Sequence, residues 1–76
     1  DEVKFDIVKR VLAHYRATHA VLDVDGARIN FQGGWGLVRA SNTQPALVLR
    51  FEAVSPARLA EIRSEVEAVV RSAQPQ

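Results

Sequence analysis

Apolar residues recur at every third or fourth position near both ends of the chain, and this spacing predicts two amphipathic helices. The first apolar stripe consists of Phe5, Val8, Leu12 and Tyr15. The second consists of Leu59, Ile62, Val66, Val69 and Val70. Ser55 and Pro56 predict where the second helix begins, because Ser accepts a hydrogen bond at an N-cap and Pro suits the first helical position.

Between the two helices the pattern changes to alternation of apolar and polar residues, which predicts four strands. The expected strands cover residues 20–24, 27–31, 35–40 and 47–52. Asp25-Gly26 and Gln32-Gly33-Gly34 are typical turn sequences, and a polar loop ending at Pro45 precedes the fourth strand. Short turns join antiparallel neighbours. We therefore expect an α+β fold: a four-stranded antiparallel sheet with two helices on one face, in the order α-β-β-β-β-α.

The composition limits the chain to one ordinary domain, expected to cover residues 1–76. A chain of 76 residues with 47% hydrophobic and 25% charged residues has the balance of a globular domain. Its net charge of +1 does not favour electrostatic binding of nucleic acid, and its lack of Cys excludes disulfides. No apolar run is long enough to span a membrane and no signal-peptide pattern is present, so we expect a cytoplasmic protein. A start at Asp1 rather than Met suits a domain excised from a larger protein.

Four hydrogen-bonding side chains gather at the end of the third expected strand: Arg39, Ser41, Asn42 and Thr43. Arginine presents a planar set of donors that matches the oxygens of phosphate, and hydroxyl, amide and backbone N–H groups can complete a ring of donors. No carboxylate lies within this segment to repel an anion. An alternative remains open on residue types alone: these residues also form ordinary turns, with Arg39 paired to an acid such as Glu52.

The segment Gly34-Trp35-Gly36-Leu37-Val38-Arg39-Ala40-Ser41-Asn42-Thr43-Gln44-Pro45, followed by the Leu-rich strand 47–53, resembles domain 4 of the α-D-phosphohexomutases. The similarity is greatest to bacterial phosphomannomutase/phosphoglucomutases, dense over residues 25–53 and looser in the helices. It implies a TATA-box-binding-protein-like fold and the C-terminal phosphosugar-binding domain of a larger enzyme. It also implies that Arg39 is the main charged contact to the phosphate and that Ser41, Asn42 and Thr43 complete the ring. Many members of the family have Glu where this chain has Gln44, so a role for that position is in doubt.

The resemblance implies a reaction for the whole enzyme, namely reversible phosphoryl transfer between hexose 1-phosphate and hexose 6-phosphate through a bisphosphorylated intermediate. Glucose and mannose phosphates are the implied substrates, and carbohydrate metabolism, including exopolysaccharide biosynthesis, is the implied setting. The family's phosphoserine and magnesium loops lie in earlier domains, so Mg²⁺ is implied for the full enzyme and no catalytic residue or cofactor for this domain. The implied partners are the phosphosugar and the other domains, with no nucleic acid and no membrane.

Two other classes of function remain as alternatives: a small nucleic-acid-binding module and a protein-interaction module. Trp35 could stack on a sugar, but packing beside Gly36 is the simpler interpretation. His14 and His19 have no third ligand nearby in the sequence, so a metal site is not expected. Asp23-Val24-Asp25-Gly26 lacks the remaining ligands of a calcium loop and is interpreted as a hairpin turn.

Overall fold

The fold consists of a four-stranded sheet with one helix at each end of the chain. A computed structural model describes residues 2–24, 26–41 and 46–74. Within these ranges the elements are α1 (Glu2–Arg16), β1 (Val21–Leu22), β2 (Ala27–Phe31), β3 (Gly34–Ala40), β4 (Leu47–Ala53) and α2 (Pro56–Ala73). This order confirms the predicted α-β-β-β-β-α arrangement. The first strand has two residues rather than the five expected, because Val24 turns away from the sheet and is 92% exposed.

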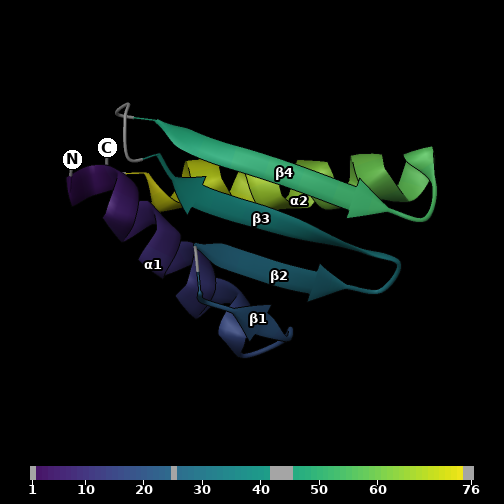
Figure 1. Ribbon diagram of the computed structural model, residues 1–76, viewed down its shortest axis with the longest axis horizontal. Coiled ribbons are helices and arrows are strands. Elements are labelled where there is room, and N and C mark those ends of the chain that lie inside the picture. The colour runs from purple at the N-terminus through teal and green to yellow at the C-terminus, as the bar shows by residue number, and fades with distance from the viewer. Residues whose placement is uncertain (1, 25, 42–45, 75–76) are drawn as a thin grey trace.

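The strands lie in the sheet in their order along the chain, and each pairs antiparallel with the next (Figure 1). The register places Val21, Ile29, Gly36 and Phe51 in one row across all four strands. Alternate side chains of a strand point to opposite faces. This row and its same-face neighbours therefore form the surface on which the helices pack.

Both helices cover the same face of the sheet. Figure 1 shows α2 behind β3 and β4, while α1 packs against β1, β2 and β3. The core between these layers consists of Ile7, Val8, Val11, Leu12, Tyr15, Ala27, Ile29, Val38, Ile62, Val66, Val70 and Ala73. The expected two-layer α+β fold is thus confirmed, with one continuous apolar layer between the sheet and the helices.

Two residues of the predicted helical stripes lie at the border of the core rather than inside it. Phe5 is 49% exposed, and Leu59 is also exposed. On α1, Ile7 and Val11 fill the central positions instead, so the buried stripe is rotated toward them. Sequence spacing shows which residues share a helix face, but it does not show which of them lie at the centre of the buried side.

Glycines at two positions of β3 let the sheet approach α2 closely. The turn between β2 and β3 is shorter than expected, since Gly33 adopts a positive φ of 83° and Gly34 already pairs in the strand. Gly34 and Gly36 both face α2. A methyl group on Gly34 would lie 2.8 Å from Ile62 Cδ1, and one on Gly36 would lie 3.3 Å from Val66 Cγ2. The absence of side chains at these two positions therefore leaves the space that the buried side chains of α2 fill.

The start of α2 is fixed as the sequence predicts. The Ser55 hydroxyl accepts a hydrogen bond from the Arg58 backbone N–H at 3.1 Å, which confirms it as the N-cap. The Arg58 side chain also donates to the Gln32 carbonyl at 2.7 Å. One arginine thereby connects the first turn of α2 to the β2–β3 turn.

Tyr15 is the largest buried side chain, and its polar end has a defined partner. The hydroxyl donates a hydrogen bond to Glu65 Oε2 at 2.9 Å, which links α1 to α2. Burial, together with the hydrogen bond and the charge of Glu65, raises the pKa of Tyr15 above its ordinary value. The phenol therefore stays protonated at neutral pH and remains available as the donor.

The face opposite the helices carries Trp35, which packs against an arginine of the neighbouring strand β2. The guanidinium of Arg28 lies over the indole at 4.4 Å, a cation–π contact between neighbouring strands. Gly36 points to the other face of the sheet, so it is not the packing partner of Trp35. A sugar-stacking role for Trp35 is not required to explain its place in the fold.

Candidate functional site

The candidate site lies where β3 ends and β4 begins. Arg39 is the next-to-last residue of β3, opposite Val48, and Ser41 directly follows the strand. The Ser41 backbone N–H donates to the Ala46 carbonyl at 3.0 Å, which closes the base of the connection. Arg39 and Ser41 are thus held at one corner by the sheet itself. The other two predicted residues, Asn42 and Thr43, lie outside the described residues, as does Gln44.

The register argues against the alternative in which Arg39 serves as a partner for Glu52. Glu52 lies opposite Trp35, whereas Arg39 lies opposite Val48, four residues farther along each strand. At about 3.3 Å per residue this separates the two backbones by roughly 13 Å. The two side chains share a face but belong to different ends of it, so the pairing is not supported.

Arg39 lines a pocket of about 310 Å³ at the notch between α1, the β1–β2 connection and the end of β3. The lining residues are Phe5, Val8, Lys9, Leu12, Asp23, Val24, Gly26, Arg39 and Ala40. Two of them, Lys9 and Arg39, are cationic, and one described residue, Asp23, is acidic. Asp23 is 3.5 Å from Arg16 in an exposed ion pair, which offsets its charge. The corner is therefore positive among the described side chains, as an anion site requires.

Gly26 fits this corner because it has no side chain. A Cβ at this position would lie 2.6 Å from the Val38 carbonyl oxygen and 3.0 Å from the Cα of Arg39. The residue also has a φ of 105°, a conformation that side chains rarely allow. The predicted Asp25-Gly26 turn therefore brings the chain directly against the backbone of Arg39.

Lys4 is a residue of this corner that sequence reasoning missed. It is only 9% exposed, and its ammonium group donates to the backbone carbonyl of Ser41. The available signal was its spacing: Lys4, Ile7, Val8 and Val11 share one helix face, so a lysine occupies a position that faces inward. Lys9 was missed for a different reason, since its place in the pocket that Arg39 lines depends on how α1 crosses the sheet.

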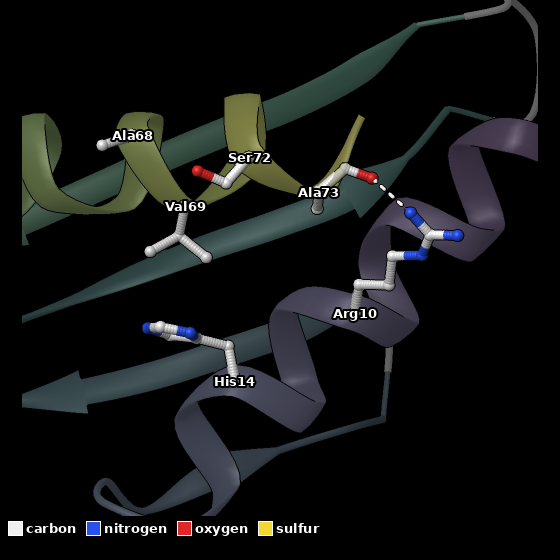
Figure 2. A pocket seen from close by; sticks show the side chains of 6 residues that line it. All are labelled: Arg10, His14, Ala68, Val69, Ser72 and Ala73. Atoms are coloured by element: carbon white, nitrogen blue, oxygen red, sulfur yellow. Dashed lines mark hydrogen bonds between the residues drawn. The ribbon is translucent and has the colours of Figure 1, made fainter. Parts of the chain in front are cut away.

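A second pocket of about 330 Å³ lies between the two helices, away from this corner (Figure 2). Arg10 and His14 of α1 face α2 there, and Arg10 donates to the Ala73 carbonyl at 3.1 Å. This bond caps the C-terminal end of α2, where carbonyl groups lack partners in the helix. Arg10 therefore has a structural explanation in its bond to Ala73.

The two histidines have packing environments of their own. The ring of His19 lies edge-on to Tyr15 and Phe31, and its Nδ1 is 2.8 Å from the Thr18 hydroxyl.

Among residues 2–24, 26–41 and 46–74, no three His, Asp or Glu side chains come together as a possible metal site. In the same part of the chain, neither helix has the length and apolar character needed to cross a bilayer.

Residues 2–69 match the family described as phosphoglucomutase/phosphomannomutase, C-terminal domain. The chain belongs to this family. The phosphomannomutase/phosphoglucomutase of Pseudomonas putida is 50% identical over 64 residues, which are 83% of this chain and 14% of that protein. The phosphoglucomutase of Neisseria meningitidis is 43% identical over 60 residues, which are 79% of this chain and 13% of that protein.

A solved structure of the same family has the same fold. A phosphoglucomutase/phosphomannomutase family protein from Burkholderia thailandensis matches with a TM-score of 0.81 and 35% sequence identity. The match covers 96% of this chain and 16% of that protein. The chain thus spans between 13% and 16% of the length of these relatives. It matches the family's C-terminal domain and shares its fold with a solved member of the family.

Proposed function

We propose that this domain binds a phosphate group of a phosphosugar at the corner formed by Arg39 and Ser41. The observation that carries the proposal is the position of these two residues at the β3–β4 junction, where the sheet ends and where Arg39 and Lys9 line the same pocket. A charged fork of donors, a hydroxyl and a positive surrounding suit the oxygens of phosphate. Asn42 and Thr43, as next residues in the chain, complete the ring of donors in this proposal.

The proposal extends to a longer enzyme of which this chain is the C-terminal domain. That enzyme interconverts hexose 1-phosphate and hexose 6-phosphate of glucose or mannose by reversible phosphoryl transfer through a bisphosphorylated intermediate. Its nucleophile and its Mg²⁺ belong to other domains, and the reaction takes place in the cytoplasm. This domain holds the phosphate that is not reacting, so its binding energy orients the reacting end of the sugar and helps to close the active site.

The chain by itself is expected to bind glucose 1-phosphate weakly and to catalyse no isomerisation. Only one end of the substrate is held, and a few phosphate contacts in an open corner must offset the loss of translational freedom. A dissociation constant on the order of 1 mM, or about −4 kcal/mol, is the expected result. A titration with glucose 1-phosphate and a coupled mutase assay on the same preparation measure both quantities. Micromolar affinity, or any turnover by this chain, would place the active site here and contradict the proposal.

A further inference from the structure

Lys4 is a buried cation whose place in the fold is not explained by packing alone. Only 9% of the residue is exposed, and among residues 2–24, 26–41 and 46–74 it is the one polar or charged residue that is buried. Taking an ammonium group out of water is costly unless the group is paired or hydrogen-bonded. An apolar side chain at this position of α1 would meet the same surroundings at lower cost. The presence of lysine therefore calls for a function of its charge.

The described residues around Lys4 are mostly apolar, and its ammonium group reaches one end of the sheet. Lys4 lines a pocket of about 540 Å³ together with Ile7, Leu47, Leu49 and Val70. At the far end of its side chain the ammonium group donates to the Ser41 carbonyl. Lys4 therefore brings a positive charge from α1 to the β3–β4 junction.

One hydrogen bond of Lys4 goes to the backbone of the proposed phosphate-binding corner. Its Nζ donates to the carbonyl of Ser41, the residue whose own N–H donates to the Ala46 carbonyl and closes the junction. The two bonds hold the backbone N–H and C=O of Ser41. Figure 1 shows the first turn of α1 at the end of the molecule where β3 ends and β4 begins. The bond from Lys4 to Ser41 joins these two segments, which are 37 residues apart in the sequence.

We propose that Lys4 is a positioning residue for phosphate binding. By holding the Ser41 carbonyl it fixes the backbone at the end of β3, and it adds a positive charge near the anion. This inference rests on the proposed phosphate-binding function and deepens it: α1 contributes to ligand binding through its first turn, without touching the ligand.

The test is a titration with inorganic phosphate and with glucose 1-phosphate of the wild-type chain, Lys4→Met, Lys4→Arg and Arg39→Ala. Met keeps the length and apolar stem of Lys without its charge. We expect Lys4→Met to weaken phosphate binding about tenfold, because the site loses a nearby positive charge and the bond that holds the Ser41 carbonyl, and Lys4→Arg to restore part of it. The Ser41 amide should exchange faster with solvent in Lys4→Met, while the midpoint of urea unfolding stays the same or rises. Arg63→Met, which removes one charge from the exposed face of α2, is the matched control and should bind as the wild type does.

The outcomes separate this inference from the proposed function. If Arg39→Ala binds phosphate as the wild-type chain does, the proposed site is wrong and the role of Lys4 is wrong with it. If Arg39→Ala loses binding but Lys4→Met retains it, the phosphate site stands and the inference is overturned. Should Lys4→Met fail to fold, the Lys4 side-chain resonances of the wild-type chain still decide. They shift on phosphate addition if the inference holds and stay unmoved if Lys4 is only structural.

Discussion

Replacing Arg39 with Ala is expected to weaken phosphosugar binding by roughly 10- to 150-fold, the largest functional effect of any single substitution in this chain. A hydrogen bond to a charged group contributes about 1.5–3 kcal/mol, and a two-pronged contact contributes more. Starting from about 1 mM, the dissociation constant of the chain would rise to about 10 mM or beyond. The dissociation constant is measured by titration of the 76-residue chain. The same substitution in the longer enzyme is measured by steady-state kinetics, in which both substrate binding and turnover should fall.

Two matched variants define what the Arg39 effect means. Arg39→Lys keeps the charge but loses the planar fork, so only partial recovery is expected. Arg50→Ala removes the same charge from the same face of the sheet, opposite Leu37 and two residues from Val48, the partner of Arg39. It should lose much less binding than Arg39→Ala if the effect is local, because a direct hydrogen bond to the phosphate contributes more than an exposed charge nearby. Equal losses in Arg39→Ala and Arg50→Ala would mean that the sheet face attracts anions without a defined site.

Replacing Gly34 with Ala is expected to cause the largest loss of stability relative to the size of the change. The added methyl group would lie 2.4 Å from the Glu52 carbonyl oxygen and 2.9 Å from the Ala53 Cβ, so the paired strand β4 must move. Overfilling a packed core costs about 1–3 kcal/mol. A domain of this size has only about 3–5 kcal/mol of net stability. Urea unfolding should therefore show a clearly lower midpoint, or a largely unfolded chain at 25 °C.

Gly36→Ala is the matched control for this prediction. It adds the same methyl group to the same strand and the same face, but the nearest atoms are ring carbons of Phe51 at 3.2 Å and Val66 Cγ2 at 3.3 Å. Side chains can shift by a few tenths of an ångström at a smaller cost than backbone, so a milder loss is expected. Equal midpoints for Gly34→Ala and Gly36→Ala would show that a clash with the β4 backbone is not the cause of the stability loss in Gly34→Ala.

Most of the fold could be predicted because local signals agreed with one another. Alternation at Ala27–Phe31 and Leu47–Ala53, the Ser55 N-cap and the periodic stripes of the helices all indicate the elements that the structure contains. The strand at Val21–Leu22 was predicted too long because apolar residues at its end suggested burial, whereas Val24 is exposed. Pattern alone does not reveal that a sheet edge ends early.

The candidate site could be predicted only where it is local in sequence. Arg39 and Ser41 were identified as neighbours along one strand end, and the structure places them at the junction as expected. Lys4 and Lys9 come from α1, and Gly26 comes from the β1–β2 connection. Their arrival at the same corner depends on how the helix crosses the sheet, which a linear pattern does not encode. The phosphate-binding roles of all four residues, Arg39, Ser41, Asn42 and Thr43, remain predictions from sequence.

The central claim is that phosphate is bound at the β3–β4 junction, and a residue-resolved titration tests it most directly. Amide and arginine side-chain resonances of the isotope-labelled chain are followed as glucose 1-phosphate is added to about ten times the expected dissociation constant of roughly 1 mM. The account predicts saturable shifts that centre on residues 39–46 and on the Arg39 Nε, with weaker shifts at Lys4 and Lys9. Shifts centred instead on the pocket between the helices, at Arg10, His14 and Val69, with residues 39–46 unmoved, would contradict it.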